Sequence, residues 1–352
     1  MGSSFDRVAL LSVETLEPLV IRDKYCKGAH YFSPPYLPSS TLSGAILSHL
    51  IRRGKLSKPE GIWMSHAFPG SRDGKVPPFR LGEPPPLPLA TISRSESGEY
   101  VSVALMFAKA MRDGPSILKE VKALSRKVEP LFFKGTKDAF RPPEKEVYTH
   151  VALNYEGRTY AYEKVGEEKY GLLFTEEIIR PGSRFFAIAF LNESVHEALG
   201  DKLTVRIGAS IKKGLGLSEV KVEEWLNLEE YRKRRMDKIG KHSNEDFLTV
   251  DVVTHTDRCV LSALKEPIYE KVIVSNFKSW FRGNFYIYRR LMGPGSVLVY
   301  PRADVEKAVE LELTPPPDNL RRIQGLDMVF FDNDIHFDSL SVLGGGLGDE
   351  IR

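Results

Sequence analysis

Alternating apolar and polar residues predict most strands of this chain, and a helical period replaces the alternation at two places in its first half. Residues 7–21 are apolar on both faces, which predicts a central strand with a kink near Pro18. A helix is predicted from Ser39 or Ser40 to Ile51, with a buried stripe of leucine and isoleucine. Further strands are predicted at 149–154, 171–179 and 184–191, all in one sheet, and at 203–207 and 217–222, with a short helix at 195–199.

The order strand, helix, strands, helix, strand is typical of a ferredoxin-like unit. A second unit is predicted to begin at Phe247, where residues 249–254 alternate. Its later candidate elements are strands at 285–291, 297–300 and 328–331 and a possible helix at 305–311. The fold class predicted is therefore α+β, with two ferredoxin-like (RRM-like) domains.

A partial repeat supports two related units. Pro181-Gly182-Ser183 opens one apolar run and Gly214-Leu215-Gly216 follows it; Pro294-Gly295-Ser296 opens another, and Gly346-Leu347-Gly348 follows that. The shared order predicts, in each unit, a strand entered through a Pro-Gly turn and a later glycine loop.

The remaining segments set the domain boundaries. Residues 55–145 lose periodicity and are rich in proline, which predicts an irregular insertion carrying a helix at 115–128. Residues 226–246 form a charged linker or a solvated helix. The domains expected are 1–225 with its insertion, and 247–352 as a second, degenerate unit.

Composition excludes several classes of protein. The chain has 352 residues, 42% of them apolar, and a net charge of only +3 from 50 basic and 47 acidic residues. An anionic partner must therefore be held by a local patch. Cys26 and Cys259 stand in no zinc-binding pair, and we expect neither a metal nor a cofactor. No membrane-length apolar run or signal peptide is present, so a cytoplasmic location is expected.

The most distinctive stretch is a glycine-rich basic loop at 207–220. Gly208, Gly214 and Gly216 permit positive φ angles and close backbone approach, and Lys212 and Lys213 place charge beside exposed amides. Such a loop suits a phosphate chain, although it lacks the Gly-Lys-Ser/Thr ending of a P-loop. A tight hairpin with two solvated lysines is the alternative.

The order of these motifs resembles the CRISPR-associated RAMP superfamily. The segment 38–45, with Pro38, Leu42, Gly44 and Ala45, is similar to the start of the first helix in that superfamily. Residues 173–185 resemble its strand pair, and 207–216 resemble its glycine-rich loop. The similarity covers about 1–225 well and 245–352 weakly.

The resemblance implies an RNA-binding subunit of a type III CRISPR effector complex, an antiviral defence assembly. Two linked domains and the segment 16–28 look most like the non-catalytic subunit that caps the complex. That subunit holds the 5′ tag of the single-stranded guide RNA beside a large polymerase-nuclease subunit and backbone RAMP subunits. The RNA-binding residues that we predict on this basis are Arg22, Tyr25, Ser40, Ser43, Gly208, Lys212, Lys213, Gly214 and Gly216.

The side chains of this set have distinct expected roles. Lys212, Lys213 and Arg22 would neutralise phosphates, while Tyr25 and three further aromatic residues would stack on bases. Those three are Tyr31, Phe32 and Tyr36, and the alternative for all four is a small satellite core. Small residues such as Ser43 in the first helix admit either a neighbouring strand or a nucleic-acid backbone.

Two catalytic alternatives remain open. A backbone subunit would cleave target RNA through an acidic loop residue, and Asp23 lies in a comparable loop; it could equally cap a turn or pair with Arg22. A metal-independent guide-processing ribonuclease would use a histidine, with His30 beside Tyr31 and Lys27, or His49, as candidates.

Overall fold

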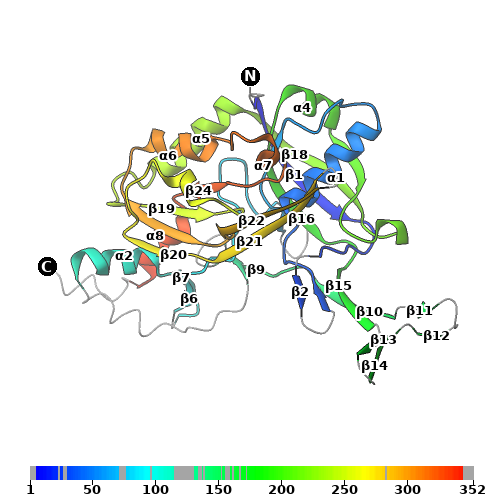
Figure 1. The fold of residues 1–352 in the computed structure, drawn as a ribbon. Coiled ribbons are helices and arrows are strands. Elements are labelled where there is room, and N and C mark those ends of the chain that lie inside the picture. The colour runs from blue at the N-terminus through cyan, green and yellow to red at the C-terminus, as the bar shows by residue number, and fades with distance from the viewer. Residues whose placement is uncertain are drawn as a thin grey trace.

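A computed structural model describes residues 5–22, 24–26, 30–70, 77–95, 97–114, 131–133, 137, 139–151, 153–154, 159–160, 162–165, 168–171, 173–281 and 284–343. The protein is α+β, with several sheets and helices (Figure 1). Within the described residues, helices long and apolar enough to cross a membrane are absent.

The main sheet is built around β1 (Arg7–Thr15), as its two apolar faces predicted. β1 pairs antiparallel with β16 (Arg184–Leu191) and β18 (Leu217–Asn227). β17 (Lys202–Arg206) extends the sheet beyond β18, and β4 (Ile62–Met64) and β5 (Phe68–Pro69) pair with β16. β4 and β5 lie within the stretch interpreted as an insertion, so part of that stretch belongs to the main sheet.

Helices cover one face of this sheet. Leu42, Ile46 and Leu50 of α1 (Ser39–Arg52) pack with Leu11 and its neighbours on β1. α4 (Glu193–Leu199) begins at Asn192, whose side chain accepts a hydrogen bond from the amide of Val195. Both helices agree with their predicted positions.

The expectation of a single sheet for 149–154, 171–179 and 184–191 is wrong. β10 (Lys145–Val151) and β15 (Leu173–Ile179) pair in a separate sheet with β3 (His30–Phe32) and β2 (Lys24–Cys26). The Pro181-Gly182 turn redirects the chain, since Gly182 has a φ of +80° immediately before β16. β10 continues into two small hairpins, β11 (Leu153–Asn154) with β12 (Thr159–Tyr160) and β13 (Tyr162–Val165) with β14 (Glu168–Gly171), which extend away from the body of the protein (Figure 1).

The described part of the insertion contains α2 (Ala104–Asp113) and two short strand pairs, β6 (Ile92–Arg94) with β7 (Tyr100–Ser102) and β8 (Phe132–Phe133) with β9 (Ala139–Phe140). Sequence periodicity did not indicate α2. The helix predicted at 115–128 lies outside the described residues.

The second half has its own sheet, in the order β20 (Tyr269–Lys271), β23 (Val297–Pro301), β19 (Phe247–Val252) and β24 (Val329–Phe331). Its helices are α6 (Val305–Leu313), α7 (Asn319–Ile323) and α8 (Asp334–Leu343). β21 (Val274–Phe281) and β22 (Asn284–Met292) form a separate long hairpin.

The strand order of the second sheet matches that of the main sheet. In the main sheet the first strand, β1, lies between β16, which is entered through a Pro-Gly-Ser turn, and β18, the last strand of this sheet along the chain. In the second sheet β19 lies in the same way between β23, also entered through a Pro-Gly-Ser turn, and β24. The repeated tripeptides therefore occupy equivalent positions, with Gly182 and Gly295 both at positive φ. The second glycine motif, 346–348, lies outside the described residues.

The two halves share a core. The segment interpreted as a charged linker contains α5 (Leu228–Gly240), whose Arg235 is fully buried against Glu312 of α6. The indole Nε1 of Trp63 donates to the carbonyl of Leu326 at 2.9 Å, and Ser39 Oγ donates to the carbonyl of Gln324 at 2.9 Å. The two sheets are therefore joined by buried polar bonds as well as by apolar packing.

Candidate nucleic-acid interface

The glycine loop connects β17 to β18, and its tip is exposed. Ser210 and Gly214 both have left-handed backbones, and they flank a single 3₁₀ turn, Ile211–Lys213. Within the described chain, the amides of Ser210, Ile211 and Lys212 donate to no acceptor. The loop thus presents bare N–H groups at its tip, an arrangement that favours an anion.

Two of the three glycines are required by close packing at the base of this loop. A Cβ on Gly208 would lie 2.3 Å from the carbonyl oxygen of Val20, and one on Gly216 would lie 2.1 Å from that of Ile207. Gly214, at the tip, has open space around it but a φ of +83°. Gly208 and Gly216 hold the loop against residues 18–21, and Gly214 turns the chain.

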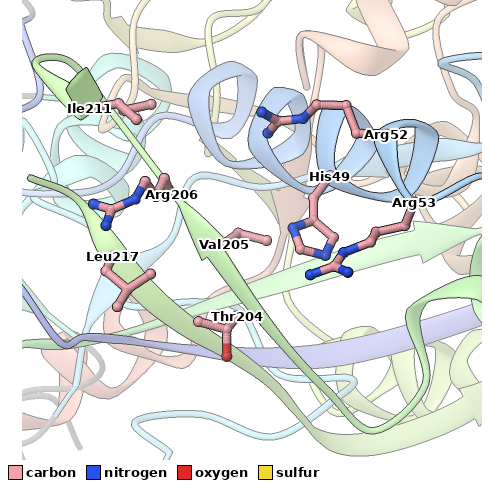
Figure 2. Close-up of a pocket in the computed structure, with 8 residues that line it drawn as sticks. All are labelled: His49, Arg52, Arg53, Thr204, Val205, Arg206, Ile211 and Leu217. Atoms are coloured by element: carbon pink, nitrogen blue, oxygen red, sulfur yellow. The ribbon is translucent and has the colours of Figure 1, made fainter. Parts of the chain in front are cut away.

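A cavity of about 460 Å³ lies beside the loop (Figure 2). His49, Arg52 and Arg53 reach it from the last turn of α1, opposite β17 and the two ends of the loop. The lining contains three arginines and one histidine but no carboxylate: His49, Arg52, Arg53, Thr204, Val205, Arg206, Ile211 and Leu217.

Most of the positive charge around this cavity is not neutralised within the described residues. Arg52 Nε donates to the carbonyl of Ser48 at 3.1 Å, whereas the side chains of Arg53, Lys212 and Lys213 have no acidic partner there. Arg206 is the exception, since it donates to Glu17 Oε2 at 2.7 Å and to the carbonyl of Leu215. Free cations beside bare amides make this surface suited to phosphates.

The positive charges around the cavity affect the protonation of His49. Partial burial, followed by the positive charges of Arg53, Arg52 and Lys55, lowers the pKa of its imidazole below 6.5. His49 is therefore neutral at pH 7, and its ring can accept a proton.

Arg22 lies in a second cluster, on the small sheet. Its guanidinium binds Glu176 Oε1 and lies over the ring of Tyr31, 4.9 Å from the centroid. Glu176 is buried, and its other oxygen is 3.1 Å from His150 Nε2. The charge of Arg22 is thus partly neutralised before any ligand binds.

The other predicted site residues are spread across both clusters or fall outside them. Tyr25 and His30 contribute backbone pairs to β2 and β3, while their side chains and the whole of Asp23 lie outside the described residues. Tyr36 stacks on the buried His66 with ring centroids 4.6 Å apart, which supports the satellite-core interpretation for that residue. Phe32 is 44% exposed.

Ser40 and Ser43 occupy the first turns of α1. Ser43 is fully buried and donates to the carbonyl of Ile323 in the second half. The close neighbour predicted from the small residues is therefore the chain's own 323–325 segment, and it covers the Ser43 hydroxyl. Ser40 is partly exposed.

The cluster of His49, Arg52 and Arg53 was not predicted as a phosphate site. The two arginines directly follow the helix predicted to end at Ile51, where basic side chains interact favourably with the helix dipole. Their proximity to Arg206 and Ile211 depends on how α1 packs against β17, which local periodicity does not specify. The basic run from His49 to Lys55 is the signal that could have indicated it.

Comparisons with known proteins bear on the family of this chain. No curated protein matches the chain. Similar solved structures include a type III-B Cmr-beta complex bound to cognate target RNA, with 11% identity, 82% of this chain and 86% of that chain covered, and a TM-score of 0.38. Type III-B Cmr-beta in the apo state has 12% identity, with 62% of this chain and 97% of that chain covered and a TM-score of 0.32. A crystal structure of Cmr4 has 14% identity, with 62% of this chain and 99% of that chain covered and a TM-score of 0.26. The model of the RAMP superfamily matches residues 12–221, more than half of the 352 residues, and the protein therefore belongs to the RAMP superfamily.

Proposed function

We propose that this protein is a non-catalytic guide-RNA-binding subunit of a type III CRISPR effector complex. In that complex it holds the 5′ tag of the guide and contacts the large polymerase-nuclease subunit and the backbone RAMP subunits. The single observation that carries RNA binding is the exposed glycine loop beside a cavity with three arginines and no carboxylate. Membership of the RAMP superfamily and the sequence motifs described above support the assignment to an effector complex.

The proposed architecture is two ferredoxin-like domains. The strands and helices β1, α1, β4, β16, α4 and β18 follow the order β-α-β-β-α-β of that fold. The second half repeats the order of the strands and of the second helix with β19, β20, β23, α6 and β24. A 3₁₀ turn, Arg258–Leu261, stands where the first half has its first helix. A chain with two such units has two faces for neighbouring subunits, which suits a capping position.

RNA binding through the loop is tested by its salt dependence. A single-stranded guide RNA should bind the purified protein, and Lys212→Ala with Lys213→Ala should lower the slope of log Kd against log salt by about 1.4, at ~0.7 per phosphate contact. Lys265→Ala with Lys307→Ala is the matched control, because both lysines are exposed and neither has an ion pair within the described residues. Equal slopes for the loop variant, the control and the unmodified protein would refute the loop as the RNA site.

Metal-independent RNA cleavage is the second candidate, and the position of His49 favours it. A neutral imidazole among arginines has the components of a general base with cationic stabilisation of a phosphorane. Repeat RNA incubated with the protein and a chelator should then be cut, and His49→Ala should abolish the cut. Intact RNA under these conditions excludes this candidate and agrees with the non-catalytic role.

A further inference from the structure

The hairpin of β21 and β22 presents one face to solvent. Both strands are long and pair with each other in a two-stranded sheet (Figure 1), and Met292 at the end of β22 also forms a bridge with Thr256. Phe277 and Leu291 lie on the inner face and pack against Leu326, while the guanidinium of Arg321 lies 5.4 Å from the centroid of the Tyr288 ring. The inner face therefore anchors the hairpin to the second half of the protein.

The outer face is cationic. Lys278 is directly opposite Ile287, and Arg289 is two residues further along β22. Lys278 and Arg289 are therefore diagonal neighbours, whose Cα atoms are typically about 7 Å apart. Both are exposed, and neither has an acidic partner among the described residues. The sequence 274–292 contains no aspartate or glutamate. Adjacent like charges without a counter-ion repel each other, so this face favours an anionic occupant.

A bulge adds a third cation at the same place. The register shifts between Ser275 and Phe277, and Arg290 adopts a left-handed backbone with a φ of +56°. Its amide donates to the side-chain oxygen of Asn276 at 3.1 Å, which holds the bulge in place. A left-handed conformation is unfavourable for arginine, and bulges often redirect a side chain toward a ligand. Arg289 and Arg290 are consequently both exposed on neighbouring positions.

We propose that the outer face of this hairpin, through Lys278, Arg289 and Arg290, is a second contact for the phosphate backbone of single-stranded RNA. The proposal rests on the proposed guide-RNA binding and extends it from the loop to a longer stretch of the same strand. Exposed apolar side chains, Val274 at 69% and Ile287 at 45%, lie among the cations and would contact bases or ribose. The lack of any carboxylate in the sequence 274–292 favours RNA over a protein surface of mixed charge as the occupant.

The test compares two RNA lengths and two sets of variants. Lys278→Ala, Arg289→Ala and Arg290→Asn together remove three cations, and asparagine tolerates the left-handed backbone. We expect this variant to lower the salt slope by about 2 on a long single strand, at ~0.7 per contact, and to leave a short strand that fills only the loop site unaffected. Val274→Ser with Ile287→Ser removes apolar contacts without changing the charge, so it should weaken binding of the long strand and leave the salt slope unchanged.

Each result separates the two proposals. If the loop variant weakens RNA binding and the hairpin variant has the slope of the unmodified protein, the hairpin proposal is overturned and the loop stands. If the hairpin variant lowers the slope and the loop variant does not, the loop proposal fails and the hairpin stands. If the hairpin variant keeps its RNA slope but no longer co-purifies with another effector subunit, the face is a protein interface and the hairpin proposal is overturned.

Discussion

Replacement of Glu312 by glutamine should destabilise the protein more than any change to a surface ion pair, because it leaves a charge buried without its partner. Arg235 is fully buried, and its Nε and Nη2 bind the two oxygens of Glu312 at 2.7 and 2.9 Å. Arg235 also donates to the carbonyls of Gly82 and Phe331, both at 2.9 Å. Glu312→Gln keeps the size of the side chain, removes the negative charge and replaces one of the two acceptor oxygens by an amide donor.

The expected loss follows from burial of the pair. Breaking a buried ion pair by removing one partner costs about 3–5 kcal/mol. With an unfolding entropy of about 2.1 cal/mol/K per residue over a chain of this length, 4 kcal/mol lowers the melting temperature by about 5 °C. The shared core between the two halves supports treating the molecule as one cooperative unit.

The assay is thermal unfolding followed by circular dichroism, and Glu224→Gln is the control. Glu224 pairs with Arg234, the residue next to Arg235, but the side chains of Arg234 and Glu224 are 39% and 30% exposed. A surface pair of this kind is worth about 0.2–1 kcal/mol, so the control should melt within ~1 °C of the unmodified protein. Arg235→Met with Glu312→Leu should recover most of the stability lost in Glu312→Gln, because both buried charges are removed. If Glu312→Gln and Glu224→Gln melt at the same temperature, the reasoning is wrong.

Three further predictions address the loop, the core and the cavity. Gly208→Ala should destabilise the protein by about 2–4 kcal/mol in chemical denaturation, because its Cβ would lie 2.3 Å from the carbonyl oxygen of Val20 at a positive φ. Gly214→Ala has open space around it and should cost only about 1–2 kcal/mol. Equal losses of stability in the two variants would contradict the packing role of Gly208. Burial, followed by the charge of His255, holds the pKa of His66 well below 6.5 in the folded protein. As the pH falls below 6.5, His66 is therefore protonated in the unfolded chain before it is protonated in the folded one. The free energy of unfolding should fall by up to about 1.4 kcal/mol per pH unit in this range. His66→Asn retains an acceptor for the Ser39 amide and should flatten that slope between pH 6.5 and 5; an unchanged slope would assign the effect to other groups. Arg53→Ala should weaken RNA binding in an anisotropy titration and lower its salt slope by about 0.7, whereas an unchanged slope would place the cavity outside the RNA path.

Local signals in the sequence accounted for many individual elements. The two apolar faces of β1 predicted its central place, since a strand in the middle of a sheet has packed layers on both of its faces. The helical stripe of α1, the strand of β16 and the Pro-Gly-Ser turns before β16 and β23 were also readable, because each depends on residues close together in the chain. The exposed tip of the glycine loop is of the same kind, since it needs only left-handed positions and polar residues.

Contacts between distant residues could not be read in this way. β10 and β15 join β2 and β3 because a turn redirects the chain, although their sequences suit either sheet. The basic sequence of α5 is typical of a solvated helix, yet Arg235 is buried because Glu312, 77 residues away, neutralises it. A charge pattern shows which residues carry charge but not which of them find a partner.

The sequence by itself determined the α+β class, the central strand, the glycine loop and the family motifs, because these depend on period, turn chemistry and composition. The tertiary structure alone decided that His49, Arg52 and Arg53 share a cavity with Arg206 and that Ser43 is covered by the second half. It also decided that Arg22 is already paired with Glu176. The physical reason is that a binding surface is made by packing elements from distant parts of the chain, and the same packing determines which charges remain available to a ligand.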